Sequence, residues 1–169
     1  SHLYNIPSTG LRFFTVYGPW GRPDMAPIIF TNAIINKKPI NIFNKGNMSR
    51  DFTFIDDVVE SIIRLIKKPA KPNNFPNKNI TNFHSSCAPY QILNVGNSSP
   101  VNLMSFIKTL EKEIGIKAIK RYKGMEPGDV ENTYADTSLI EQITGFKPKT
   151  TLESGVREFI SWYKEYYNF

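Results

Sequence analysis

The sequence predicts an α/β fold that contains pieces of two lobes, and three observations lead to this prediction. Residues 11–16 are mostly β-branched or aromatic and stop at Tyr17-Gly18-Pro19, as expected for a short strand buried on both faces that ends in a loop. Strand-like and helical segments then alternate along the chain. With 169 residues, of which 40% are apolar, the chain can bury a sizeable core. The strands are too few and too uneven for a complete doubly wound sheet.

Two helices are predicted in the first half of the chain, with short strands between them. The first should begin within residues 24–27, where Pro27 suits the first turn, and end within residues 36–39. Its apolar face comes from Ile28, Ile29, Phe30, Ala33, Ile34 and Ile35. A strand, a turn and a strand should follow, at residues 40–43, 44–47 and 50–54. Asp56 and Asp57 then begin the second helix, where the helix dipole favours acids.

A long loop is predicted at residues 67–89, where apolar periodicity is lost and Pro, Asn and Lys dominate. The next segments should be a buried strand, an amphipathic helix closed by Gly115, a strand and a Gly/Pro loop, at residues 91–95, 101–114, 117–122 and 123–129. Ser138 and Glu141 have capping-box spacing for a short helix. Thr151 should cap a last helix, to which Trp162, Tyr163 and Tyr166 give aromatic bulk.

Composition argues against several classes of protein. The net charge is +6, but the lysines are scattered and form no stripe with interleaved aromatics, so we do not expect nucleic-acid binding. No apolar run approaches the roughly eighteen residues of a membrane span, and no signal peptide opens the chain. Cys87 is the single cysteine, which agrees with a cytoplasmic protein. His84 lies near Cys87, but the only other histidine is His2, so we expect no metal site.

The loop after residues 11–16 is the strongest candidate for a ligand site. It carries one arginine and one aspartate, Arg22 and Asp24, between glycines and prolines. Open α/β sheets place their ligands at loops that leave the carboxyl ends of strands. The alternative is that both side chains only solvate a surface turn.

Four stretches of the sequence resemble one known family, and they occur in that family's order. They are "RFFTVYGPWGRPDM" at residues 12–25, "SRDFTFIDDV" at 49–58, "LNVGNSSPVNLMSFI" at 93–107 and "PGDVENTYADTSLI" at 127–140. The chain resembles the NAD-dependent epimerase/dehydratase family of extended short-chain dehydrogenase/reductases, and among its branches the UDP-glucuronate 4-epimerases. The resemblance implies the C-terminal portion of such an enzyme.

That resemblance also divides the chain. Residues 1–20 and 90–115 would complete the Rossmann-type nucleotide-binding sheet, residues 21–68 and 116–169 would form most of the small substrate-binding lobe, and residues 69–89 would be a loop. The cofactor would be NAD, bound mainly by an N-terminal half. No Gly-x-x-Gly-x-x-Gly fingerprint and no Tyr-x-x-x-Lys pair occur in the sequence, so we expect no catalytic residue in this chain and no activity of the chain alone. A homodimer is a further implication for the full-length protein.

The resemblance assigns the acidic sugar to two residues at or after the first strand. Thr15 matches the family's contact to the sugar carboxylate, although a β-branched residue can simply fill a strand. Arg22 matches the arginine of the "GRPDM" loop, and its planar fork suits a carboxylate or a phosphate. Asp24 aligns with a polar residue near the diphosphate, but it could instead cap the next helix. The residues of this chain that contact the cofactor are left open, with Phe14 as the one candidate.

Three further residues are assigned to the nucleotide. Arg50 stands where related epimerases place an arginine on the diphosphate, with an ion pair to Asp51 or Asp56 as the alternative. Phe43 resembles the residue that lies against the uracil, although a core position would also suit it. Asp129 resembles the ribose contact, and stabilising a turn is its alternative role.

The resemblance therefore implies a nucleotide-sugar epimerase that interconverts UDP-glucuronate and UDP-galacturonate through an NAD-dependent 4-keto intermediate. The ligand would be a UDP-sugar with an acidic hexose, in carbohydrate metabolism or polysaccharide synthesis. One departure concerns Glu126, which stands where related galactose epimerases carry an arginine for the second phosphate. Decarboxylation or dehydration of a nucleotide sugar on the same fold, and a non-catalytic fragment that binds nucleotide sugars, stay open as alternatives.

Overall fold

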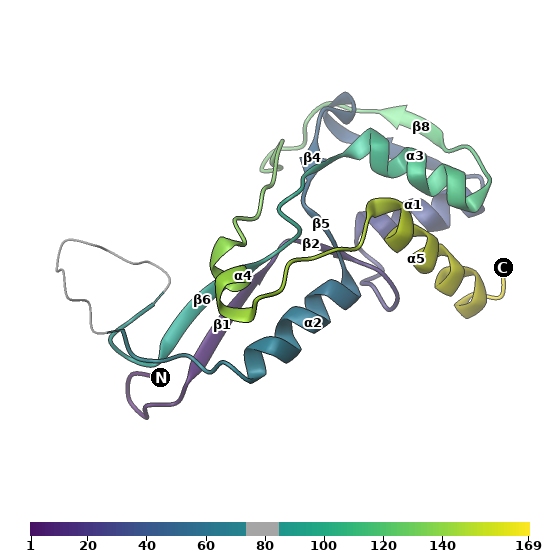
Figure 1. Cartoon of the computed structure of the whole chain (residues 1–169). Coiled ribbons are helices and arrows are strands. Elements are labelled where there is room, and N and C mark those ends of the chain that lie inside the picture. Colours follow the sequence, from purple (N-terminus) through teal and green to yellow (C-terminus); the bar gives the residue numbers. More distant parts are fainter. Residues whose placement is uncertain (74–84) are drawn as a thin grey trace.

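The structure is a computed structural model that describes residues 1–73 and 85–169 (Figure 1). The predicted loop at 69–89 therefore lies in part outside the described residues. The strands are β1 Ser8–Phe13, β2 Thr15–Tyr17, β3 Pro39–Ile42, β4 Ser49–Arg50, β5 Phe52–Phe54, β6 Tyr90–Val95, β7 Val101–Asn102 and β8 Ile119–Tyr122. The helices are α1 Ala26–Ile35, α2 Ile55–Ile66, α3 Leu103–Ile114, α4 Ser138–Thr144 and α5 Leu152–Tyr166, with a 3₁₀ turn, η1, at Phe43–Gly46.

The described strands form four pairs. Three pairs are parallel, β1 with β6, β2 with β5 and β3 with β8, whereas β4 and β7 run antiparallel. Helices connect the parallel partners, which is the α/β pattern that the sequence predicts. No helix among the described residues is long and apolar enough to span a membrane.

Two apolar cores hold the described elements together. The larger lies among α1, α3, α5, β3 and β5, and Phe106 and Phe159 are fully buried in it. The smaller lies among α2, α4 and β6, around Leu93 and Val95. Figure 1 shows the same division, with α1, α3 and α5 at one end and with α2 and α4 along the β1–β6 pair. The lobe boundaries given above stay a prediction.

The predicted strand at residues 11–16 is in fact two strands, and this expectation was wrong. Phe14 donates its N–H to Val95 O at 3.0 Å, which continues the β1–β6 ladder, whereas Thr15 donates to Asp51 O at 3.1 Å and begins the pairing of β2 with β5. The strand changes partner between these two residues. Nor is it buried on both faces, since the Phe13 side chain is about half exposed.

The predicted strand at residues 50–54 is also divided, at Asp51. Arg50 pairs with β7, and Phe52 begins the pairing with β2. Asp51 between them is fully buried, and its carboxylate accepts N–H groups from Asn97 at 2.7 Å and Ala135 at 3.0 Å. The strand is thus interrupted at Asp51, whose side chain is hydrogen-bonded to backbone groups of distant residues.

The helix predictions are mostly confirmed. Pro27 lies in the first turn of α1, which ends at Ile35; Gly115 closes α3 with φ 82°; and Thr151 caps α5 by accepting the Ser154 N–H. The capping box predicted for α4 does not form.

The N-cap of α4 is Thr137, whose hydroxyl donates to the Glu141 carboxylate at 2.8 Å. Ser138 bonds to Asp136 instead, through both its N–H and its hydroxyl.

Candidate functional site

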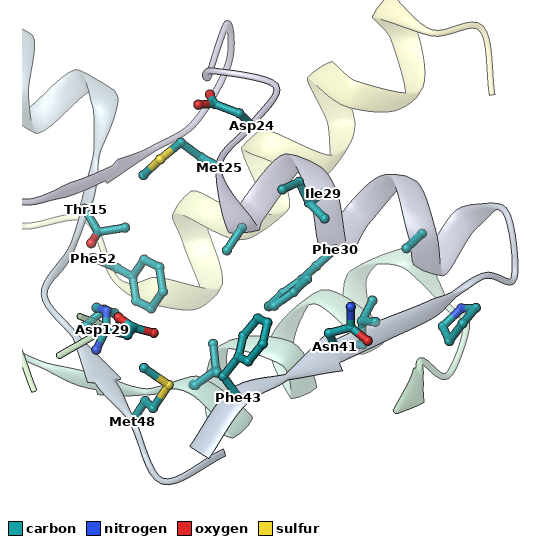
Figure 2. Close-up of a pocket in the computed structure, with 16 residues that line it drawn as sticks. Thr15, Asp24, Met25, Ile29, Phe30, Asn41, Phe43, Met48, Phe52 and Asp129 are labelled. Atoms are coloured by element: carbon teal, nitrogen blue, oxygen red, sulfur yellow. Dashed lines mark hydrogen bonds and ion pairs between the residues drawn. The ribbon is translucent and has the colours of Figure 1, made fainter. Parts of the chain in front are cut away.

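A cavity of about 500 Å³ opens beside α1, between the end of β3 and the start of β2 (Figure 2). Its walls are mostly apolar and come from β2, α1, β3, β5 and the loops between them. Five of the six residues predicted to bind substrate line it: Thr15, Asp24, Phe43, Arg50 and Asp129. The chain thus brings together residues from four separate stretches of sequence. The sixth, Arg22, lies outside this cavity.

Thr15 is held at one side of the cavity by its backbone. Its N–H donates to Asp51 O at 3.1 Å, where β2 begins. The same Asp51 follows Arg50, so one buried residue joins two predicted binding residues. In Figure 2, Thr15 lies near Phe52 and Asp129.

Arg50 is fixed by three oxygen contacts within the fold. Its Nη2 lies 2.8 Å from Asp129 Oδ1, and its Nη1 donates to the carbonyls of Ser49 at 2.9 Å and Glu131 at 3.0 Å. Only 18% of its side chain is exposed. The predicted alternative, a pair with Asp51 or Asp56, was wrong: the partner is Asp129, 79 positions away, because antiparallel β4 and the bridge from Ser49 to Asn132 bring the two stretches together.

Asp129 has a structural role as well as its place in the cavity wall. Besides Arg50, its Oδ1 accepts the Val130 N–H at 2.8 Å, and its own N–H donates to Glu126 O. These bonds form a turn, as the alternative for this residue anticipated. The Glu126 side chain is exposed.

Phe43 begins η1, directly after β3, and its ring is half-buried at the apolar side of the cavity. The Lys123 ammonium lies 5.8 Å from the centroid of this ring, within the range of a cation–π contact. Asn41 lies on the same side of the cavity, as Figure 2 shows. The aromatic face and the cation together suit a flat, polar ring.

Arg22 and Asp24 bind each other in the loop after β2. Arg22 Nε donates to Asp24 Oδ1 at 3.1 Å and Nη2 to Oδ2 at 2.5 Å, and both side chains are largely exposed. The shared hydrogen bonds and opposite charges raise the pKa of the Arg22 guanidinium and lower that of the Asp24 carboxyl. Asp24 does not cap α1, whose N-cap is Met25 without a side-chain bond, because Arg22 occupies its carboxylate.

A second cavity, of about 440 Å³, adjoins the first. Arg22 lines it together with Phe14, Trp20 and the glycines and proline of the loop. Met25 lies on the walls of both cavities. Arg22 and the cofactor candidate Phe14 thus share one cavity, next to the one that holds the other five residues.

Residues 1–81 match the model of the NAD dependent epimerase/dehydratase family. Over these residues the chain is similar to this family. It is 54% identical over 167 residues to Protein CapI of Staphylococcus aureus, covering 99% of this chain and 50% of that protein. It is 49% identical over 168 residues to the probable UDP-glucuronate 4-epimerase of Rhizobium meliloti, covering 99% of this chain and 49% of that protein. The chain spans about half the length of the curated relatives that it matches.

The fold of this chain also agrees with a solved structure. The UDP-glucuronic acid 4-epimerase of Bacillus cereus, in complex with UDP-glucuronic acid and NAD, superposes with a TM-score of 0.79 at 29% identity, over 98% of this chain and 48% of that one. The predicted α/β fold, a part of a Rossmann-type extended short-chain dehydrogenase/reductase, is thereby confirmed.

Two residues that support the site were not predicted. Asp51 links β2, β5 and the segments at Asn97 and Ala135, and the signal for it is a lone acid inside a strand-like stretch. Tyr17 is buried where β2 enters the Arg22 loop, and burial, followed by the nearby acids of α2 and α5, raises the pKa of its phenol. A Cβ on Gly155 would lie only 2.3 Å from its Oη.

Proposed function

We propose that this chain forms the nucleotide-sugar side of a UDP-glucuronate 4-epimerase, which interconverts UDP-glucuronate and UDP-galacturonate through a 4-keto intermediate with NAD. The observation that carries the proposal is the set of chemical groups in the two adjoining cavities. An aromatic ring at Phe43 and the fixed cation of Arg50 line one cavity, and the exposed cation of Arg22 lines the other. A UDP-sugar with an acidic hexose carries a matching base, diphosphate and carboxylate. The relatives named above support this substrate.

Arg50 suits the diphosphate in this proposal, since its guanidinium is already fixed when the ligand arrives. Its contacts to Ser49 O, Glu131 O and Asp129 fix the plane of the fork. A preorganised donor loses less side-chain entropy on binding an anion. The ribose would then lie beside Asp129 and the uracil against Phe43.

Thr15 and Arg22 would hold the sugar carboxylate. A 4-keto uronate is a β-keto acid, so loss of CO₂ competes with return of the hydride. Charge-assisted hydrogen bonds stabilise the localised charge of the carboxylate more than the dispersed charge of the transition state for decarboxylation. Arg22 and Thr15 therefore favour epimerisation over decarboxylation.

The second cavity suits the ring end of NAD, because Phe14 and Trp20 give it flat apolar walls. When bound, NAD supplies the hydride acceptor and donor for C4 of the sugar. The sequence has no glycine fingerprint for the pyrophosphate and no Tyr-x-x-x-Lys pair for proton transfer. In this proposal those groups belong to residues outside these 169, and the chain alone is inactive. A cytoplasmic location, supported by the single Cys87, and a homodimer, implied by the family, complete the proposal.

The test is product analysis of the full-length protein with UDP-glucuronate and NAD, followed by NMR. We expect UDP-galacturonate from the unaltered protein. Arg22→Ala should bind the substrate more weakly or release a pentose nucleotide. Arg64→Ala, which removes an arginine from an exposed ion pair on α2, is the matched control and should change neither.

Two outcomes would contradict the proposal. A pentose or deoxy-keto product from the unaltered protein would indicate a decarboxylase or a dehydratase. Calorimetric binding of UDP-glucuronate without any turnover would indicate a non-catalytic binding protein.

A further inference from the structure

Both arginines that line the two cavities are already paired with an aspartate. Among the described residues, the charged side chains on the cavity walls are Arg22, Asp24, Arg50 and Asp129, whose charges sum to zero. An anionic ligand therefore meets no net positive charge from these walls. The selectivity of the site for anions therefore depends on which aspartate, Asp24 or Asp129, the anionic ligand can displace from its arginine.

We infer that Asp24 is a specificity-determining residue: it holds the Arg22 fork as an internal anion, which the acidic group of a nucleotide sugar must displace. The inference rests on the function proposed above and goes beyond it, since Asp24 then opposes the ligand instead of binding it. Its effect is to lower the affinity for acidic sugars relative to neutral ones.

The geometry of the pair supports displacement. Asp24 takes the Nε and Nη2 donors of Arg22 in a two-point contact, which is the contact that a ligand carboxylate would make. A local turn, in which Met25 N–H donates to Arg22 O at 3.2 Å, brings the two side chains together. The partners are two positions apart and exposed by 74% and 63%, so the exchange requires no rearrangement of the core.

A ligand cannot displace Asp129 from Arg50 in the same way. Its arginine also binds two backbone carbonyls, its aspartate closes a turn, and it joins stretches 79 positions apart. Displacing Asp129 would leave part-buried groups without partners, which is unfavourable. The exchangeable anion in this site is therefore Asp24.

The location of Asp24 also gives the direction of the effect. Asp24 lies on the wall of the main cavity, while Arg22 lies on the wall of the adjoining one. The carboxylate of an acidic sugar must compete with Asp24 for the donors of Arg22, whereas a neutral sugar has no such competition. Replacing Asp24 with asparagine keeps its shape and removes the charge.

The test compares UDP-glucuronate with UDP-glucose, which differ only in the carboxylate at C6, by calorimetry on the full-length protein with NAD. In Asp24→Asn we expect the Kd of UDP-glucuronate to fall about two- to fivefold, the range set by an exposed ion pair, and that of UDP-glucose to stay the same. Glu60→Gln is the matched control, because it removes one negative charge from another exposed pair, with Arg64 on α2. It should leave both affinities unchanged.

A double variant shows whether the gain acts through Arg22. In the Arg22→Ala background, Asp24→Asn should give no further gain for UDP-glucuronate. An unchanged or higher Kd of UDP-glucuronate in Asp24→Asn would overturn the inference, because Asp24 would then be neutral or would orient Arg22 for the ligand. Failure of the unaltered protein to bind either nucleotide sugar would instead overturn the proposed function, and the inference with it.

Discussion

The predicted site draws on two regions that are held in different ways. One is the junction of β4 and β5 with residues 129–135, where Asp51 is fully buried and Arg50 binds two oxygens from distant residues, Asp129 Oδ1 and Glu131 O, besides the adjacent carbonyl of Ser49. The other is the loop of residues 18–25, where the contacts of Arg22 are local and exposed. The first region is formed by the fold itself, while the second can exchange its partner for a ligand without unfolding anything. The following experiments test that difference.

The largest effect should come from Asp51. Asp51→Ala leaves the N–H groups of Asn97 and Ala135 without acceptors, and each such loss costs about 1–3 kcal/mol, so we expect the free energy of unfolding to fall by about 2–6 kcal/mol. Urea unfolding of the full-length protein measures it. Asp56→Asn, an exposed acid in the first turn of α2, should cost less than about 1 kcal/mol. Equal losses in the two variants would show that the junction is not a rigid support.

Arg50 and Arg22 should differ in which ligands they affect. Arg50→Ala should weaken UDP-glucose and UDP-glucuronate alike, by about ten- to a hundredfold, because it removes charge-assisted bonds to a diphosphate that both ligands carry. Arg22→Ala should weaken UDP-glucuronate alone. Calorimetry with the two ligands measures both effects, with Arg64→Ala as the control. Loss of UDP-glucose binding in Arg22→Ala would place both arginines on the diphosphate and remove the distinction.

Gly155 tests how the residue before the Arg22 loop is held. Tyr17 ends β2 and packs against α5 where that helix has no side chain; a Cβ there would lie 2.3 Å from the Tyr17 Oη and 2.9 Å from Phe54. Gly155→Ala should therefore destabilise the protein by about 1–3 kcal/mol. Gly124→Ala is the control, since nothing lies within 4 Å of its Cβ. Similar melting temperatures for the two variants would mean that Tyr17 moves freely.

Local sequence patterns were sufficient to predict the helices. They were not sufficient to predict where a strand changes its pairing partner. Pro27, Gly115 and Thr151 mark helix ends through bonds to near neighbours, so the sequence around them carries the information. The breaks at Phe14 and Asp51 depend on Val95, Asn97 and Ala135, which no local periodicity reveals.

The same limit applies to the site. The resemblance selected five residues that share a cavity, but the alternative roles given for two of them, Asp24 as a cap of α1 and Arg50 as a partner of Asp51 or Asp56, were wrong. Asp24 fails as a cap because an arginine two positions earlier takes its carboxylate. Arg50 fails to pair with its neighbours because Asp51 turns into the core and the chain returns with Asp129 beside it.

The smallest effect concerns the titration of Asp24, which distinguishes an exchangeable pair from a fixed one. Arg22 lowers the pKa of the Asp24 carboxyl in the folded protein, so the pair is intact above the ordinary range of an aspartate and is lost as the pH falls through the lowered pKa. In carbon-13 NMR of the carboxyl group, Arg22→Ala should return this pKa to its ordinary range. Saturation with UDP-glucuronate should also raise the pKa of the Asp24 carboxyl, because the ligand carboxylate binds the Arg22 guanidinium in its place. UDP-glucose should leave this pKa lowered. If the pKa stays low with UDP-glucuronate bound, Asp24 keeps its hold on Arg22 and the loop is as fixed as the junction.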